Sequence, residues 1–292
     1  MRKGILAGIL AASLASYSGC GEMARNSVGK ELTRRLPGLT LCQDGKYDLD
    51  SRCIGDLSTL NDMERSVYQI QKWVYYVPDA GAPEAFKKYF KDEVKKDYIS
   101  DMVLVGGGSG IMLKDNYMLS AAHVFRDAEP KDVNYMGHTY KVSPVFMIHY
   151  ASIGGKLYEV KVEAKGSLDV ALLKVRNIPP SMRFPEVKLG KDSEHYSGQM
   201  VYIVGSGDLW GIQVRKGTVT RPDMITLAGR ELLPSAYAKG KHFLIDGRIV
   251  PGDSGGAVYS SRDGRLEVTG MMVMVNPIAT LIGICLGIES IV

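Results

Sequence analysis

Short apolar stretches recur along the chain from residue 102 onward, each separated from the next by turn-forming residues. They are rich in Val, Ile, Leu and Tyr, which favour β-strands. They lie at 102–105, 109–113, 117–121, 138–149, 156–163 and 169–175, and then at 199–204, 212–219, 242–246, 256–260, 266–274 and 280–288. Many short strands at such spacing predict an all-β barrel or sandwich. The proline-containing segment 176–186 divides the two series and predicts a bridge between two lobes.

The stretch before residue 100 has a different pattern. Apolar residues recur at helical spacing through 63–77, yet the same stretch is rich in Val, Tyr and Trp, so the pattern alone leaves helix and strand open. Pro83 then precedes an amphipathic pattern over Glu84–Lys96, which predicts a short helical insertion. Residues 61–64 match a capping box, which indicates a helix that begins there.

The first twenty residues predict a signal peptide. Arg2 and Lys3 precede an apolar run from Ile5 to Leu14 that is too short for a comfortable membrane span. No later stretch is long and free enough of charge to span a bilayer. We therefore expect an exported protein of the cell envelope or periplasm.

The end of this signal resembles the lipobox of bacterial lipoproteins, in which a cysteine carries lipid after cleavage. Cys20 follows Ser18 and Gly19, as that resemblance requires, whereas Tyr17 departs from the usual leucine. The resemblance implies a membrane-anchored lipoprotein. The alternative is ordinary cleavage after Ala15, which gives a soluble exported protein.

Residues 21–60 are polar and lack periodicity, which predicts a tether or extended arm. Export places the chain in an oxidising compartment, where disulfides persist. Cys42 and Cys53 lie close together within this arm and are the expected disulfide pair. Cys285 falls in a β-type stretch and is interpreted as a buried, small apolar residue.

The composition is that of an ordinary globular protein, with 45% hydrophobic and 23% charged residues. The net charge of +4 is modest and no long Lys/Arg run occurs, so nucleic-acid binding is not indicated. No spacing of Cys and His suggests zinc, and we expect neither a metal nor a cofactor. The oligomeric state is not readable from the sequence.

The candidate chemistry centres on Ser254, which lies between small residues in the segment 251–258. Glycines at such a turn permit positive φ and close approach of another backbone. A serine alone is a poor nucleophile and needs a base and an orienting acid. His123 and Asp169 lie upstream, each followed by apolar residues, and the order His, Asp, Ser is that of chymotrypsin-fold hydrolases.

Three short sequences resemble the signatures of chymotrypsin-fold, or trypsin-like, serine peptidases, and the bacterial HtrA-type branch is closest. They are Ser120-Ala121-Ala122-His123, Asp169-Val170-Ala171-Leu172-Leu173 and Gly252-Asp253-Ser254-Gly255-Gly256. The flanking segments 108–112 and 243–246 agree with that branch, and 282–288 resembles its last strand. The resemblance covers roughly residues 65–292.

This resemblance implies two six-stranded antiparallel β-barrels, with a first strand within 67–77. It also places the helical insertion in the first hairpin, where HtrA-type enzymes carry a regulatory loop. The peptidase domain would span 61–292, with barrel one at about 61–178 and barrel two at about 185–292. We do not expect the PDZ domain that many HtrA-type enzymes carry, because the sequence stops at Val292.

The resemblance also implies roles for the three residues. His123 would act as general base and then general acid, Asp169 would orient its ring, and Ser254 would be the nucleophile. The amides of Gly252 and Ser254 would form the oxyanion hole. Each residue also has a simpler interpretation: His123 as a partly buried histidine, Asp169 as a turn aspartate and Ser254 as part of a Gly/Ser turn. The catalytic interpretation outweighs these because all three signatures occur in order.

Asp253 raises a question, since trypsin-like zymogens use an aspartate at this place to bind a new N-terminus. The segment 103–107 superficially resembles such an N-terminus, but it lies only 20 positions before His123 and fits a strand. We therefore do not expect proteolytic activation, and the partner of Asp253 stays open.

The substrate pocket is expected to be mostly apolar, which favours a small or medium aliphatic side chain. Its walls would be Arg248, Ile249, Val250, Met271, Met272 and Val273. Arg248 would favour acidic side chains if it pointed inward, and we expect it to point to solvent. The remaining histidines, His138, His149, His195 and His242, are expected to be structural or surface residues.

Three functions remain in view. The first is an endopeptidase acting on exported or unfolded polypeptides through an acyl-enzyme intermediate. The second is a non-catalytic binding or chaperone-like protein on the same fold. The third is an esterase-like hydrolase, against which the order of the three signatures argues. The sequence favours the first and does not reveal the natural substrate or whether residues 79–100 regulate it.

Overall fold

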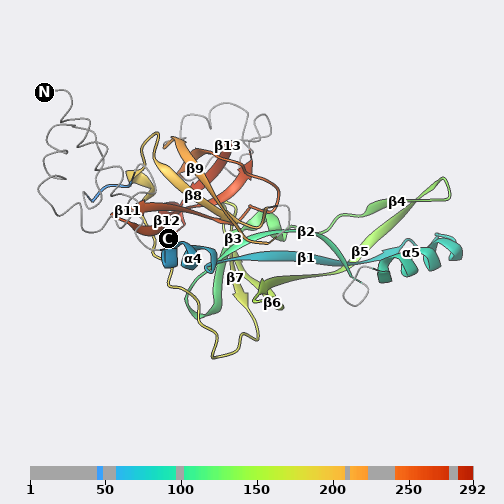
Figure 1. Ribbon diagram of the computed structural model, residues 1–292. Coiled ribbons are helices and arrows are strands. Elements are labelled where there is room, and N and C mark those ends of the chain that lie inside the picture. The colour runs from blue at the N-terminus through green and yellow to red at the C-terminus, as the bar shows by residue number, and fades with distance from the viewer. Residues whose placement is uncertain are drawn as a thin grey trace, which may run out of the picture.

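The computed structural model describes residues 45–48, 57–96, 102–207, 211–222, 241–275 and 282–291. In these residues the chain forms two antiparallel β-barrels, each closed by six strands. The blue-to-green first barrel and the orange-to-red second barrel are seen in Figure 1. The expected all-β class and two-barrel architecture are confirmed.

The first barrel is closed by its first strand, which pairs with two neighbours. Its strands are β1 (Val67–Pro78), β2 (Val103–Met112), β3 (Tyr117–Ala121), β5 (His138–Ile153), β6 (Lys156–Lys165) and β7 (Val170–Val175). The order is β1-β2-β3-β7-β6-β5, and β1 pairs with β5 to close the ring. β4 (Lys131–Tyr135) pairs with β5 at the outer edge. Inward-facing residues such as Ile70, Met118 and Leu173 fill the core.

The second barrel closes in the order β10-β13-β12-β11-β8-β9. Its strands are β8 (Met200–Gly205), β9 (Gln213–Arg221), β10 (His242–Asp246), β11 (Ala257–Arg262), β12 (Arg265–Val275) and β13 (Ile282–Gly287). Ile203, Phe243 and Ile245 are buried in its core. Cys285 is a free, buried thiol there, and burial raises its pKa well above the ordinary value, as expected for a small apolar residue.

An apolar cluster joins the two barrels. It combines Val67 and Ile111 of the first barrel with Tyr259 and Met271 of the second. The hydroxyls of Ser66 and Tyr259 lie 2.5 Å apart, so the buried phenol has a polar partner. Burial raises the pKa of Tyr259 to about 12, so it stays neutral. This packing fixes one barrel against the other.

The ambiguous stretch 63–77 forms both kinds of structure. Helix α4 (Leu57–Glu64) ends where β1 begins, so the helix start indicated at 61–64 is wrong. Instead, the Asn61 carbonyl accepts the Arg65 amide at 2.9 Å in the last turn. Met63 is buried between the barrels, and β1 is paired on both sides, so tertiary contacts outweigh the local capping pattern.

The predicted insertion helix is confirmed as α5 (Glu84–Lys96). It lies at the far end of the first barrel, against the long β4–β5 hairpin (Figure 1). Phe86 is fully buried and stacks on Tyr140 with ring centroids 4.4 Å apart. The amphipathic pattern therefore marks a face that packs on the sheet.

Two strand predictions differ from the structure. The stretches 102–105 and 109–113 form one strand, because the intervening glycines pair with β1; a side chain on Gly107 would overlap the Ile70 carbonyl. β4 was not predicted, because it is mostly exposed and lacks an apolar alternation. It forms through backbone pairing with β5 at the edge of the sheet.

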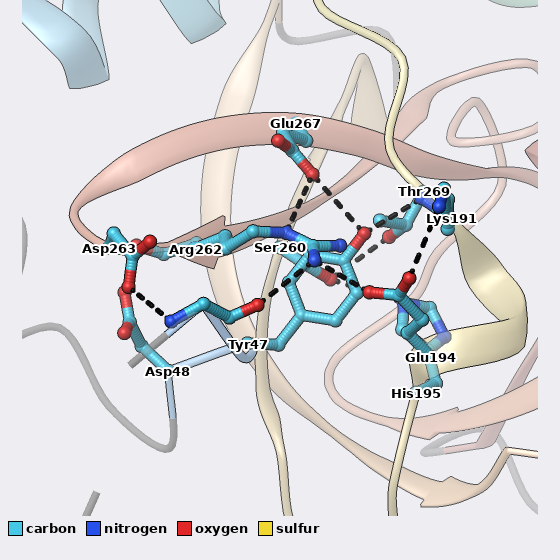
Figure 2. Close-up of polar contacts among 12 residues, drawn as sticks. Tyr47, Asp48, Lys191, Glu194, His195, Ser260, Arg262, Asp263, Glu267 and Thr269 are labelled. Carbon is cyan, nitrogen blue, oxygen red and sulfur yellow. Dashed lines mark hydrogen bonds and ion pairs between the residues drawn. The ribbon is translucent and has the colours of Figure 1, made fainter. Parts of the chain in front are cut away.

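Residues 45–48, within the segment predicted as a polar arm, pack at the end of β11, where Tyr47 pairs with Arg262 (Figure 2). Tyr47 is only 1% exposed, and the Arg262 guanidinium lies 4.2 Å above its ring. The Lys191 amide donates to the Tyr47 hydroxyl at 2.8 Å, and the Ser261 hydroxyl donates to Asp48 at 2.5 Å. Burial raises the pKa of Tyr47 to about 12.

Three cysteines for which we make predictions, Cys20, Cys42 and Cys53, lie outside the described residues. Among the helices that are described, none is long and apolar enough to cross a membrane.

Candidate active site

His123 and Asp169 are held together by neighbouring strands. His123 lies in a short 3₁₀ helix, η3 (Ala122–Phe125), directly after β3, and Asp169 directly precedes β7, which pairs with β3. The ring nitrogen Nδ1 of His123 lies 2.7 Å from Oδ2 of Asp169. The other carboxylate oxygen accepts the His123 amide at 2.8 Å, and the Asp169 carbonyl accepts the Ala122 amide at 2.8 Å. The pair is therefore fixed through both side chain and backbone.

Asp169 adopts a left-handed conformation, with φ of +59°. Aspartate tolerates this region better than most residues. Its side chain is almost fully buried, while that of His123 is 25% exposed. The carboxylate is thus shielded, and the imidazole has one side open toward solvent.

The turn after His123 is held by three side chains of the first barrel. Lys72 donates to the Arg126 carbonyl at 2.5 Å and Lys165 to the Phe125 carbonyl at 2.8 Å. His149 hydrogen-bonds the backbone of Val124, and its pKa is lowered to about 4, chiefly by burial and also by Lys72. His149 is therefore neutral and structural, as the sequence suggested.

Ser254 lies in a compact turn between β10 and β11. Gly252 and Gly255 have φ of +100° and +84°, a region that favours glycine. The Asp253 amide donates to the Val250 carbonyl at 3.1 Å, and the Gly255 amide donates to Met272 at 2.7 Å. A side chain on Gly255 would overlap the Ser109 carbonyl, so the turn requires glycine there.

This turn lies against the part of barrel one that carries His123. A Cβ on Gly108 would lie 2.6 Å from Val124 and 2.7 Å from the Ser254 carbonyl. Only the backbone of Gly108 therefore fits between the turn after His123 and the Ser254 loop. The Ser109 amide donates to the Ser254 carbonyl at 2.7 Å. The three predicted residues are therefore brought to one region between the barrels.

Within the described residues, no hydrogen bond joins the Ser254 hydroxyl to the His123 ring. Such bonds are often long or poorly aligned until substrate binds. The amides of Gly252 and Ser254 have no acceptor among the described residues either. Two backbone donors are thus available beside the serine.

The structure gives Asp253 a partner that the sequence did not reveal. Its side chain is 1% exposed and forms an ion pair with Arg215 on β9. The second carboxylate oxygen accepts the Val250 amide at 2.8 Å. Arg215 also donates to the Arg248 carbonyl at 2.9 Å, so it binds the loop at both ends. The partner of Asp253 is therefore an internal arginine and not a new N-terminus.

The residues expected to line the pocket do not share one surface. Ile249 and Met272 are buried in the core of the second barrel. Met271 and Val273 face the opposite side of β12 and belong to the cluster between the barrels, as strand alternation requires. Val250 is half-buried. Arg248 is exposed, in agreement with the expected outward orientation.

Arg215 and Ser109 were not singled out from the sequence as site residues. Ser109 does occur in the flank 108–112 that resembles the family, which is a weak signal. Arg215 has no such signal, because only the pairing of β9 with β8 and β10 brings it to the serine loop. In the part of the chain that the structure describes, no group of three or more His, Cys, Asp or Glu side chains is suited to hold a metal.

Solved structures show the same fold. The Rv3671c protease in its inactive form superposes with a TM-score of 0.51 at 16% identity, over 84% of this chain and 93% of that chain. Its active form, from M. tuberculosis, gives a TM-score of 0.51 at 17% identity, over 84% and 85% of the two chains. The HtrA-type protease AlgW with tripeptide gives 0.51 at 14% identity, over 79% of this chain and 59% of that chain.

A sequence search of curated proteins gave no significant match. The family model described as "Trypsin-like peptidase domain" matches residues 108–271, which is more than half of the chain and includes His123, Asp169 and Ser254. The chain therefore belongs to the family of trypsin-like peptidase domains.

Proposed function

We propose that this protein is a serine endopeptidase that cleaves exported or unfolded polypeptides through an acyl-enzyme intermediate. The observation that carries the proposal is the His123–Asp169 contact at 2.7 Å, directly beside the loop that presents Ser254. A buried carboxylate on Nδ1 leaves the other ring nitrogen free to exchange a proton with a nucleophile. The non-catalytic binding protein is the alternative.

In this mechanism the Ser254 hydroxyl attacks the substrate carbonyl and gives its proton to Nε2 of His123. The amides of Gly252 and Ser254 stabilise the oxygen that becomes negative, because both lack another acceptor in the described residues. His123 then protonates the leaving amine, which breaks the peptide bond. Water, deprotonated by the same histidine, releases the acyl group and restores Ser254.

Substrate preference is proposed to be apolar. The proposal rests on the apolar sequence of strand β12 and of the segment before Ser254, since the side chains of Ile249, Met271, Met272 and Val273 divide between the core of the second barrel and the cluster between the barrels. The exposure of Arg248 argues against a cation at the base of the pocket. We expect cleavage after Val, Ile, Ala or Leu.

The cellular setting is proposed from the N-terminal sequence. The signal peptide implies export, and Cys20 implies a lipid anchor at the membrane. The several acyl chains of a lipoprotein anchor firmly, whereas one chain binds weakly. Polypeptides of the cell envelope are then the substrates within reach.

An organophosphonate probe tests the proposal. It should label wild-type protein on Ser254, and Ser254→Ala should abolish both labelling and cleavage of an unfolded model polypeptide. Because the three groups act as a unit, Ser254→Ala or His123→Ala should each reduce turnover on the order of 10⁶-fold. Asp169→Asn should cost on the order of 10⁴-fold, since it favours the wrong imidazole tautomer.

Ser193 serves as a matched control, because it is an exposed serine on the second lobe. Ser193→Ala should keep labelling and cleavage at wild-type rates. If Ser254 resists the probe in the presence of unfolded substrate and no peptide is cut, the binding-protein alternative replaces the endopeptidase.

A further inference from the structure

Ser109 has all of its polar atoms engaged in the space between the two barrels. It lies on β2 of the first barrel and is fully buried. Its amide donates to the Ser254 carbonyl at 2.7 Å, and its hydroxyl donates to the Gly252 carbonyl at 2.7 Å. The same hydroxyl accepts the Ser206 amide at 2.8 Å. Three of these bonds reach the second barrel, and the fourth, to Ser120, stays within the first.

The hydroxyl therefore connects two separate segments of the second barrel. Ser206 follows β8, and Gly252 belongs to the turn before β11. A hydroxyl has one proton to donate and lone pairs to accept with, so Ser109 satisfies both partners at once. Without it, the buried amide of Ser206 and the partly buried carbonyl of Gly252 would lose this partner.

The orientation of Gly252 depends on contacts from outside its own turn. It lacks a Cβ, so a wide range of φ and ψ is open to it, and the bonds of its neighbouring peptides hold its φ at +100° and with it the direction of its amide. Arg215 binds the loop from the other side, at the Arg248 carbonyl and the Asp253 carboxylate. The carbonyl of Gly252 itself is held only from the first barrel among the contacts described.

We propose that the Ser109 hydroxyl is a positioning group for the Ser254 loop, which sets the Gly252 amide from the first barrel. This inference rests on the proposed function and deepens it, because it makes the oxyanion donors depend on the packing of both barrels. Ser109 does not touch the reacting atoms. It acts through Gly252, so its loss should affect transition-state stabilisation more than substrate binding.

The test compares Ser109→Ala with Ser120→Ala. Both remove a buried hydroxyl between neighbouring strands, but Ser120 donates to the Ser109 carbonyl and not to the loop. Ser109→Ala should lower kcat about 10- to 100-fold, the scale of losing or misplacing one oxyanion donor. KM should change less than about threefold, since an interaction made mainly in the transition state is lost. Ser120→Ala should lower kcat less than about threefold.

Hydrogen exchange supplies a readout that does not need catalysis. Exchange of the peptide spanning 248–256 should be faster in Ser109→Ala and unchanged in Ser120→Ala. If Ser109→Ala does not fold, Ser109→Cys replaces it, because a thiol keeps the size but is a weak donor and acceptor. A folded Ser109 variant with wild-type kcat and wild-type loop exchange overturns the inference.

The two measurements separate this inference from the proposed function. In one outcome, loop exchange is faster in Ser109→Ala, no variant cleaves substrate and Ser254 is not labelled. This outcome would support the positioning of the loop by Ser109 and reject the peptidase function. Cleavage that is lost in Ser254→Ala but unaffected in Ser109→Ala would sustain the peptidase and reject the positioning role.

Discussion

At the scale of single residues, the serine loop contains one buried carboxylate that needs compensation, that of Asp253. A charge taken out of water is costly unless a partner and hydrogen bonds compensate for it. Arg215 supplies the charge, and the Val250 amide supplies the second bond at 2.8 Å. Gly205 leaves room for this pair, since a Cβ there would lie 2.6 Å from the carboxylate. The loop conformation is thus set without a free N-terminus.

We predict that Arg215→Met leaves the Asp253 carboxylate buried without its charged partner and destabilises the protein by about 3–5 kcal/mol. Activity should fall as well, because the Arg248 and Asp253 ends of the loop lose their common donor. Urea unfolding and peptide cleavage measure the two effects. Adding Asp253→Asn should restore part of the stability but not the activity.

The control is Arg221→Met, on the same strand but exposed. It should change stability by less than about 0.5 kcal/mol. Equal losses in the Arg215 and Arg221 variants would contradict a special role for the buried pair.

Two buried histidines predict how stability depends on pH. Burial lowers the pKa of His149 and of His195 to about 4. The ordinary pKa of an unfolded histidine is about 6.5, so between these values the unfolded chain binds protons that the folded chain does not. Stability is therefore fully present above pH 6.5 and is lost as the pH falls toward 4.

At pH 5 this linkage amounts to about 2 kcal/mol for each histidine. Urea unfolding at pH 7.5 and at pH 5 should show a smaller pH dependence in His149→Gln than in wild type, whatever the absolute stability. The exposed His138 is the matched control, and His138→Gln should keep the full dependence. If the stability of the His149 variant depended on pH as strongly as that of wild type, groups other than His149 would cause the pH dependence.

At the scale of elements, β11 connects the Ser254 loop with the place where segment 45–48 packs on the second barrel. It begins at Ala257, three residues after Ser254, and ends at Arg262, which covers the Tyr47 ring. Figure 2 shows Arg262 between Tyr47 and the carboxylate of Glu267, with Glu194 beside it. The segment 45–48 thus binds the end of the strand farthest from the serine. It stabilises the barrel without reaching the site.

Substitution of Tyr47 tests this separation of stability from activity. Tyr47→Ala should destabilise the protein by about 3 kcal/mol, as truncation of a buried aromatic does, while kcat changes little. Tyr47→Phe keeps the ring and loses only the bonds to Lys191 and Glu267, so it should cost about 1 kcal/mol. Thermal unfolding and peptide cleavage give the two readouts. A large fall in kcat for folded Tyr47→Phe would show that the segment acts on the site.

The elements also show what sequence reasoning could and could not reach. The strands that alternate or are wholly apolar were predicted closely, and so was α5, because local periodicity reports the buried face. β4 is an exposed edge strand, and α4 is set by the burial of Met63 between barrels. Arg215 and Ser109 act through partners far away in the sequence, so no local pattern could identify them.

At the scale of the whole molecule, the proposed site lies where the two barrels meet. His123 and Asp169 come from the first barrel, and Ser254 and the ion pair that holds its loop come from the second. The contacts across this boundary include the Ser66–Tyr259 pair and the bonds of Ser109. A change that loosens the barrels should therefore reduce activity before either barrel unfolds.

Segment 45–48 attaches the N-terminal arm to the second barrel. The predicted Cys42–Cys53 disulfide would close a loop around this segment. Residues 45–48 lie inside the loop that this bond closes. By chain-entropy reasoning a loop of this length is worth roughly 2–3 kcal/mol. The double variant Cys42→Ser/Cys53→Ser should therefore lower the unfolding temperature by an amount comparable to that of Tyr47→Ala, and leave kcat nearly unchanged.

Thiol mapping on exported protein tests the bond directly, with Cys285 as an internal reference. Cys285 is a buried free thiol, so an alkylating reagent should reach it only after unfolding. In denaturant without reductant, Cys285 should be alkylated while Cys42 and Cys53 stay protected. With reductant, all three should react. Alkylation of Cys42 and Cys53 without reductant would show that the arm is held by the docking of Tyr47 and Asp48 alone, and the disulfide would be rejected.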